Sequence, residues 1–401
     1  MTVSRVRILV LCFWVLAGAW YFLKSGAVLS VSPAPVGTDL SGNNLFWFKG
    51  NTHAHARISL EEYLHGDSSP AMVANWYRGH GYDFVVITDH NRFEDARSLN
   101  PINTDNSGFL VIPGMEVTSD YRYPGVNQQV ERKIHASALN INNPVDWNFD
   151  NPEKSAIIQQ QISRIKANGG LHILNHPNYQ FQIELDDILG APGLKLFELY
   201  NAHPRSNQPG HAGFRPGVEA LWDQVLSSGR LIYGVAADDA HDFKWYRSVL
   251  RYFGSAPPGG AWVMVKSRKL DAISITTALE NGDFYSSTGV HLKDVLISNK
   301  QYQVSLDLER TRREVKHHWV RSHAPKVWSD DTHFVIEFIG PQGTILKSTH
   351  NQQQASIDLH NLQGYVRVRV TYLEKIDSMT GADTARAYYA WTQPLMMTDE
   401  P

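Results

Sequence analysis

Cysteine is nearly absent from this sequence of 401 residues. The single cysteine, Cys12, lies in an apolar run near the N-terminus. One thiol excludes a disulfide framework and a metal site made of several thiolates. Any metal ion must therefore be held by nitrogen and oxygen ligands, and the 18 histidines of the chain are a ready source of nitrogen.

A large excess of either charge is also lacking, since 37 basic residues stand against 40 acidic ones and the formal net charge is −3. Such a chain has no bulk attraction for nucleic acid or for an anionic membrane surface, and we expect no nucleic-acid partner. The sequence has no internal repeat and no low-complexity segment. Its length favours two domains with additional segments.

A nearly unbroken apolar run follows Arg5 and Arg7 at the start of the chain. The run is shorter than the ~20 residues that a membrane-spanning helix needs. We interpret residues 1–24 as a retained signal anchor, with a cleaved signal peptide or a buried core helix as alternatives. Both signal interpretations place the body of the protein outside the cytoplasm, either attached to a bacterial inner membrane and facing the periplasm or released. Residues 25–44, rich in Ser, Gly, Pro and Asn, are interpreted as a linker.

Short apolar runs alternate with helical patterns from residue 45 to about residue 290, which is typical of parallel strands covered on both faces. Helices are predicted over Pro70–Gly79, Pro152–Ala167, Pro216–Ser228 and Leu270–Asn281. Strands are predicted over Phe46–His53, Phe84–Thr88, Phe109–Ile112, Ile134–Leu139, Gly170–Leu174, Leu194–Leu199 and Leu231–Ala237. Six or seven such β-then-α units predict an α/β fold, a TIM-like β/α barrel over residues 45–290.

The pattern changes after about residue 290. Runs of alternating apolar and polar residues, such as Tyr302–Leu308 and Tyr365–Thr371, are separated by turn residues. This pattern predicts a small antiparallel β-sandwich domain over residues 291–401.

Residues with metal-binding side chains follow nearly every strand predicted in the first domain. His53 and His55, two apart at a strand end, point to the same face. The carboxyl ends of all strands in a β/α barrel meet on one face, so we expect these residues to converge. The set comprises His53, His55, Asp89, His90, Glu116, His135, His176, Asp239 and His241.

Each of these motifs is weak by itself. A lone His-x-His pair is more often surface or core packing, and a lone Asp-His pair can cap a helix. The repetition at successive strand ends is what indicates a metal site. The set is too large for one ion, so we expect two or three divalent metal ions (Zn, Mn or Fe), with Glu116 or another carboxylate as the bridge. His172, which alternates with Leu171 and Ile173, is interpreted as a packed core histidine.

The order of these motifs carries a family resemblance. His53-x-His55, Thr88-Asp89-His90, Gly114-x-Glu116, His135, Asn175-His176-Pro177 and Asp239-x-His241 resemble the PHP (polymerase and histidinol phosphatase) superfamily of metal-dependent phosphoesterases. The resemblance covers residues 45–290. Softer motifs, Phe284–Gly289 and Ala390–Pro394, resemble the carbaryl-hydrolase-like branch, which pairs such a barrel with a β-sandwich.

The resemblance implies a distorted seven-stranded barrel with two or three metal ions. His53, His55, Glu116 and Asp239 would hold the first ion. The second would share Glu116 and add His135 and His176. The third would use His90, His241 and Glu61, which stands where the superfamily has His or Asp.

The expected activity is hydrolysis by a hydroxide that bridges two metal ions, since two cations strongly acidify the water between them. Asp239 or Asp238 would move the proton, and His90 or His241 would protonate the leaving group. Arg205 and Arg215, in a loop after the sixth strand, either bind the phosphoryl group of the substrate or belong to a solvated basic loop.

Glu198 and Asn201 either orient a metal ligand or make ordinary loop hydrogen bonds. The leading hypothesis is a phosphoesterase acting on a small phosphoester. The alternatives are an amide, ester or carbamate hydrolase with the same metals, and a non-catalytic binding module whose metals are structural.

Overall fold

The computed structural model describes residues 45–56, 67–95, 108–122, 131–149, 151–244, 256–298, 300–328, 333–376 and 384–397. The predicted signal segment 1–24, the linker 25–44 and Glu61 lie outside these residues. Among the helices of the described residues, none is long and apolar enough to cross a membrane.

The first helix shows how local sequence sets an element. Helix α2 (Pro70–Gly79) begins after Ser69, whose side chain accepts a hydrogen bond from the backbone N of Met72, and Pro70 occupies the first turn. A hydroxyl cap followed by proline is a strong helix start, because both suit backbone groups that lack helical partners. The predicted helix Pro70–Gly79 is confirmed.

Strand β1 (Phe46–Asn51) pairs in parallel with β2 (Phe84–Val86), and β2 pairs in parallel with β3 (Leu110–Ile112). A Cβ atom at Gly50 would lie 2.1 Å from the ring of Phe84, so only glycine allows this close pairing. On its other side β1 pairs antiparallel with β9 (Trp262–Ser267), which pairs with β10 (Phe284–Ser287).

A second sheet has the order β4-β5-β6-β7-β8. Its strands are β4 (Gly114–Arg122), β5 (Glu131–Leu139), β6 (Leu171–Leu174), β7 (Leu196–Asn201) and β8 (Tyr233–Ala237). Strand β5 runs antiparallel to both β4 and β6, whereas β6, β7 and β8 are parallel.

The prediction that all strands of this region are parallel is therefore wrong at β5, and β4, β9 and β10 are antiparallel strands that the sequence did not predict. Residues 123–130 connect β4 and β5, and parallel strands need a crossover of a dozen residues or more. The two sheets meet through isolated bridges, Ala54 with Ala240, His90 with Glu116, and Glu94 with Gly114. The structure is a mixed α/β fold with several sheets, and the seven parallel strands of a TIM barrel are not reproduced.

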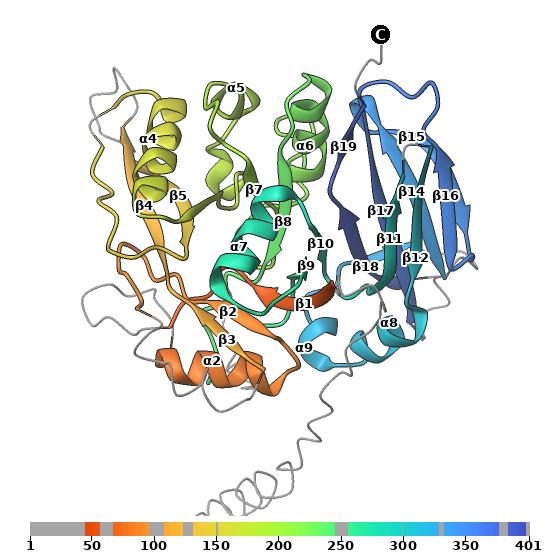
Figure 1. Ribbon diagram of the computed structural model, residues 1–401, viewed down its shortest axis with the longest axis horizontal. Helices are drawn as coiled ribbons and strands as arrows, with labels where there is room; N and C mark the ends of the chain where they lie inside the picture. The colour runs from red at the N-terminus through yellow and green to blue at the C-terminus, as the bar shows by residue number, and fades with distance from the viewer. Residues whose placement is uncertain are drawn as a thin grey trace, which may run out of the picture.

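Figure 1 shows helices side by side along the outer face of the second sheet. They are α4 (Lys154–Ala167), α5 (Leu185–Leu189) and α6 (Val218–Ser227), and α7 (Ala272–Asn281) packs on β9. Three of the predicted helices begin two residues later than expected, at Lys154, Val218 and Ala272. A short 3-10 turn, η2 (Tyr179–Phe181), follows β6.

The C-terminal region contains two antiparallel sheets that share one apolar core, including Tyr302, Val304, Phe338 and Val368. The smaller sheet contains β11 (Leu292–Ile297), β12 (Gln301–Leu306) and β16 (Gln354–Asp358). The larger contains β13 (Lys326–Trp328), β14 (Phe334–Gly340), β15 (Thr344–His350), β17 (Tyr365–Ile376), β18 (Thr384–Thr392) and β19 (Leu395–Met396). Helices α8 (Leu308–Glu314) and α9 (His318–Arg321) and the turn η3 (Pro341–Gly343) complete it.

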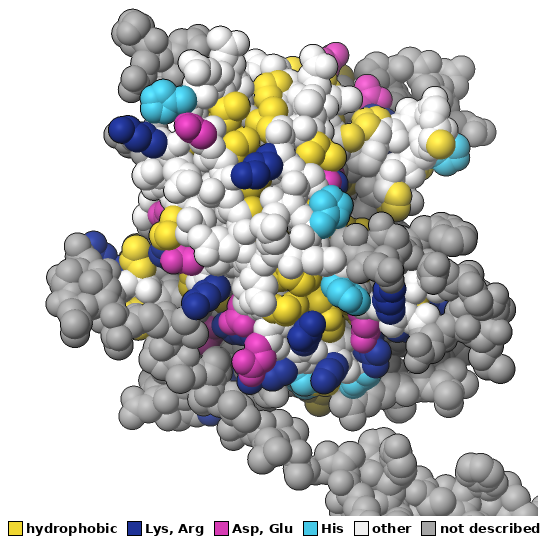
Figure 2. All heavy atoms as spheres, turned by 90° about the vertical axis from the view of Figure 1, so that its right-hand side faces the viewer, with side chains coloured by type: hydrophobic (Ala, Val, Ile, Leu, Met, Phe, Trp, Pro, Cys, Tyr) yellow, Lys and Arg dark blue, Asp and Glu magenta, His cyan; other side chains and the backbone are white. Residues whose placement is uncertain are grey.

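The two regions are joined by backbone pairing. Strand β18 pairs with β10, so one sheet of 11 strands runs across the boundary that was predicted near residue 290. Figure 2 shows acidic and basic side chains gathered together in the lower half of the face that it views, below a part with mostly uncharged and hydrophobic side chains. Such a mixed surface agrees with the nearly even charge balance of the sequence.

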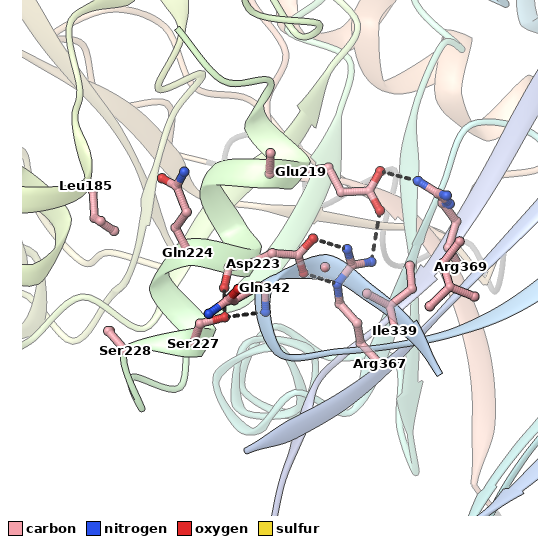
Figure 3. A pocket seen from close by; sticks show the side chains of 13 residues that line it. Leu185, Glu219, Asp223, Gln224, Ser227, Ser228, Ile339, Gln342, Arg367 and Arg369 are labelled. Atoms are coloured by element: carbon pink, nitrogen blue, oxygen red, sulfur yellow. Dashed lines mark hydrogen bonds and ion pairs between the residues drawn. The ribbon is translucent and has the colours of Figure 1, made fainter. Parts of the chain in front are cut away.

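A buried ion pair also links the regions. The guanidinium of Arg367, 1% exposed, donates to both carboxylate oxygens of Asp223 on α6 at 2.8 and 2.7 Å and lies 2.9 Å from Glu219. These side chains line a cavity of about 810 Å³ between α6 and the larger C-terminal sheet (Figure 3). None of the predicted metal ligands within the described residues lines this cavity.

Candidate metal centre

Two imidazoles lie edge to edge where β1 ends. His53 and His55 are both fully buried, and their Nε2 atoms are 3.1 Å apart. Backbone hydrogen bonds hold this segment against the chain after β8, from the N–H of His55 to the carbonyl of Ala240 and from the N–H of Asp239 to the carbonyl of His53, both 2.9 Å. The end of β8 is thereby brought to the end of β1.

Asp239 completes a triangle of ligand atoms. Its Oδ1 lies 3.3 Å from Nε2 of His53 and 3.2 Å from Nε2 of His55. Asp239 has a φ of +50°, a left-handed conformation that non-glycine residues rarely adopt and that recurs at functional sites. Donor atoms around a four-coordinate ion lie about 3.3 Å from one another, so the triangle has the size of a metal site.

Glu116 lies at the centre of the cluster, as the third residue of β4 rather than at the C-terminal end of a strand. One oxygen, Oε2, is 2.6 Å from Nδ1 of His90 and 3.5 Å from Nε2 of His55. The other, Oε1, is 3.0 Å from Nδ1 of His135 and 3.6 Å from Nε2 of His176. A carboxylate whose two oxygens face different imidazoles is placed as a bridging ligand would be.

His241 lies at the side of the cluster formed by His55 and His90. Its ring stacks on the ring of His55 with centroids 4.1 Å apart, and its Nδ1 donates to the carbonyl of Asp239 at 2.8 Å. The side chains of His90 and His241 are each 18% exposed, more than the other histidines of the cluster. These two imidazoles are therefore the ones that an incoming molecule reaches first.

The donor set fits divalent metal ions. Three overlapping groups of ligand atoms have the spacing that an ion needs: His53, His55 and Asp239; His90, Glu116 and His135; His55, His90 and His241. The Nε2 atom of His135 is buried and has no hydrogen-bond partner among the described residues, which a metal ion would supply. The grouping differs from the expected one, because His90 lies with Glu116 and His135 as well as with His241.

The electrostatics favour the forms that bind metals. Burial by itself would raise the pKa of Glu116, but His90 and His135 outweigh burial and hold this pKa well below its usual range. Burial lowers the pKa of His135 to about 4, and burial with the nearby His241 lowers the pKa of His55. An ionised carboxylate among neutral imidazoles is the state in which these groups coordinate a cation.

His53 differs from His55 and His135, and His176 shares a raised pKa, because nearby carboxylates outweigh burial there too. Burial would lower the pKa of His53, but the carboxylates of Asp239, Glu198 and Glu116 outweigh burial and raise the pKa well above 6.5. Since an imidazole must be neutral to coordinate, binding an ion at His53 releases a proton there.

Two strand-end residues noted in the sequence contact the cluster from behind. Glu198 accepts from Nδ1 of His53 at 2.7 Å, and Asn201 donates to Glu198 at 2.8 Å and to Oδ2 of Asp239 at 3.2 Å. Asn175 similarly donates to Oε1 of Glu116 at 2.8 Å. Thr118, close to Nδ1 of His90 at 2.7 Å, was not foreseen, because it lies inside a strand that the sequence did not reveal.

Two other acidic residues of the sequence motifs have supporting contacts. Oδ1 of Asp89 accepts from the backbone N of Ala56 at 2.7 Å. Asp238 accepts from three backbone N–H groups, of Gly259, Gly260 and Ala261, and from the hydroxyl of Tyr77. Asp238 thus holds the loop before β9, and we do not give it the proton-transfer role considered from the sequence.

The two arginines expected near the substrate differ. Arg205 is exposed and follows His203, whose ring lies 5.5 Å from that of His241. The guanidinium of Arg215 instead makes contacts within the protein, donating to the carbonyl of Phe181 at 2.6 Å and pairing with Glu184 at 3.0 Å. It stabilises the turn after β6, so we assign Arg215 no contact with substrate.

That turn brings an aromatic ring to the cluster. Tyr179 lies with its ring 5.1 Å from that of His176 and 6.0 Å from that of His135. The neighbouring Gln180 and Phe181 both have positive φ, 53° and 54°, and His176 has a φ of 22°. No sequence pattern singled out Tyr179, because one tyrosine in a loop carries no periodic signal.

No protein-family model and no curated protein matches the chain. Among solved structures, the chain is similar to a two-domain protein from Bacteroides vulgatus ATCC 8482 described as containing a predicted PHP-like metal-dependent phosphoesterase. The identity is 13%, the match covers 91% of this chain and 99% of that one, and the TM-score is 0.41. A likeness of this size carries no argument about fold or activity. The histidines and carboxylates of the cluster by themselves fit a metal-dependent hydrolase.

Proposed function

We propose that this protein is a metal-dependent hydrolase whose substrates are phosphoesters. The observation that carries the proposal is the position of Glu116, whose two oxygens face five imidazoles, four from the ends of β1, β2 and β6 and one from the middle of β5. A purely structural site is normally closed by four ligands around one ion, whereas this cluster offers more ligand atoms than one ion can use.

Our assignment of ligands follows the geometry. His53, His55 and Asp239 would hold one ion, with Glu116 shared between it and a second ion at His135, His176 and His90. His241 with His55 and His90 would hold a third, to which Glu61 would add a carboxylate. When bound, such ions activate a water molecule and neutralise charge on the phosphoryl oxygens.

The protein itself would position and protonate the substrate. Nδ1 of His241 donates to the carbonyl of Asp239, so Nε2 would protonate the leaving oxygen in a centre of two ions, where His241 binds no metal. Oδ1 of Asp239 would accept the proton of the attacking water. Arg205, at the rim beside His203, would bind the phosphoryl oxygens.

The test combines metal analysis with a substrate panel. Residues 45–401 would be purified, their metal content measured by mass spectrometry, and turnover measured with p-nitrophenyl phosphate, bis(p-nitrophenyl) phosphate, p-nitrophenyl acetate and a p-nitrophenyl carbamate. We expect at least two ions per chain and hydrolysis of a phosphoester, both lost in His53→Ala and Asp239→Asn.

The outcomes separate the alternatives. Turnover of the acetate or carbamate alone would indicate the amide, ester or carbamate hydrolase. Bound metal without turnover of any substrate would indicate the non-catalytic module. A protein that binds no divalent ion would refute the proposal.

A further inference from the structure

We propose that Glu198 is a positioning residue that sets the tautomer of His53 and fixes the spacing of the ligands from three strands. The inference rests on the proposed metal centre. It concerns a side chain that would touch neither metal nor substrate.

The contacts of Glu198 span the cluster. Its side chain is 1% exposed, in the middle of β7. Oε1 lies 2.7 Å from Nδ1 of His53, and Oε2 accepts from the backbone N of His176 and from Nδ2 of Asn201, both at 2.8 Å. Three donors from the ends of β1, β6 and β7 thus converge on one carboxylate.

The first contact decides which nitrogen of His53 can coordinate. An ionised carboxylate only accepts hydrogen bonds, so Nδ1 of His53 must carry the proton. Nε2 then presents its lone pair to the triangle with His55 and Asp239. A carboxylate behind a ligating histidine fixes the ring orientation and makes the coordinating nitrogen more basic.

The other two contacts hold backbone and side chain in place. His176 has a φ of 22°, an unfavourable conformation that needs support from its surroundings, and its N–H is bound by Glu198. Asn201 donates to Glu198 and, through the same amide nitrogen, to Oδ2 of Asp239. The carboxylate of Glu198 therefore reaches ligands of both proposed ions without contacting either ion.

Glutamine cannot replace Glu198, although it has the same size. If its oxygen faces His53, its amide N–H₂ opposes the donors of His176 and Asn201. If its oxygen faces those two donors, its N–H₂ donates to Nδ1 of His53 and drives the proton to Nε2, which then cannot coordinate. Aspartate is shorter by one methylene but still only accepts, so it keeps the tautomer of His53 at the cost of longer contacts.

The experiment measures metal binding by metal-free protein, with Co²⁺ as the probe. Cobalt affinity would be obtained by competition with a chelator, and the visible absorption of the bound ion would report its coordination. We expect Glu198→Gln to weaken the tightest cobalt site by about 10- to 100-fold and to change its spectrum. Glu198→Asp should weaken it less than Glu198→Gln. Asn201→Ala, which leaves the carboxylate in place, should give a smaller loss.

The ranking separates positioning from packing. If Glu198 only fills space, the isosteric Gln variant binds cobalt like the wild type and the Asp variant is the weaker one, which would overturn the inference. Glu337→Gln, which breaks a 2.9 Å ion pair with Arg369 in the C-terminal sheet, is the matched control and should leave cobalt binding unchanged. If Glu198→Gln does not fold, Glu198→Asp and Asn201→Ala decide, because wild-type cobalt affinity in both variants would contradict the inference. A wild-type chain that binds no cobalt would refute the metal centre itself.

Discussion

The sharpest consequence of the geometry concerns Glu116→Gln. In the native cluster, Oε1 of Glu116 accepts from Nδ2 of Asn175 at 2.8 Å, and Oε2 faces His90 and His55. A glutamine amide would keep its oxygen toward Asn175, because the opposite orientation sets two N–H₂ groups against each other. Its own N–H₂ group would then occupy the position of Oε2, where a donor cannot coordinate.

The size of the effect can be bounded. Loss of a residue that only supports a metal ligand costs about 10- to 100-fold in affinity. Loss of a shared ligand must cost more, so we expect the second ion, to which His90 contributes, to bind at least ~100-fold more weakly, about 2.7 kcal/mol or more. The ion at His53 and Asp239 keeps its other ligands. Because the proposed hydrolysis uses both ions, the rate of phosphoester turnover should fall by a larger factor than the metal affinity does.

Metal stoichiometry by mass spectrometry after dialysis, with turnover at saturating metal, checks this prediction. Glu219→Gln is the control, since Glu219 pairs with Arg367 and Arg369 outside the cluster. We expect the Glu116 variant to lose at least one ion per chain and the control to lose none. Full occupancy in Glu116→Gln would show that Glu116 is not a bridging ligand.

Three further predictions concern stability. Burial lowers the pKa of His172 to about 3, below the unfolded value near 6.5, so its neutral form is favoured in the fold and stability is lost as pH falls below 6.5. At pH 5 this loss is about 2 kcal/mol. In urea titrations, the free energy of unfolding should therefore fall between pH 7.5 and pH 5 by about 2 kcal/mol less in His172→Leu than in the wild type, and an equal fall in both proteins would contradict the prediction. Asp223→Asn should lower the free energy of unfolding by about 3 kcal/mol because the buried Arg367 loses its bidentate partner, and a loss under 1 kcal/mol in denaturant titration would show that Glu219 compensates. Arg215→Ala should increase proteolysis and amide exchange around Phe181 with little change in metal content, whereas a rise in KM with unaltered exchange would restore its substrate role.

Features with a local chemical cause were predictable from the sequence. The helix Pro70–Gly79 starts and ends as expected because Ser69 and Pro70 set its first turn. Strands β1, β2 and β8 lie within the apolar runs predicted for them, and the polar residues that follow them meet. Parallel strands deliver the residues at their ends to a common edge whatever the intervening loops do, so this part of the cluster could be inferred without knowing the full topology.

Features set by pairing partners were not predictable. Glu116 and His135 lie inside β4 and β5, and they face the cluster because these strands are antiparallel neighbours, in which Thr118 pairs with His135. Alternation of apolar residues does not reveal strand direction. The sequence also placed Arg215 in the correct loop, but the direction of its guanidinium depends on the carbonyl of Phe181, which only the folded turn presents.

The adjacent carboxylates of Asp238 and Asp239 show what backbone conformation adds to composition. In sequence the two are equivalent candidates for proton transfer. In the fold, Asp238 accepts three backbone N–H groups of the loop before β9, and Asp239 faces His53 and His55. The positive φ of Asp239 turns the chain sharply at this point, so that the two side chains leave in different directions. Asp238 therefore fixes the loop beside the centre, and Asp239 alone is placed to share a metal ion or accept a proton there.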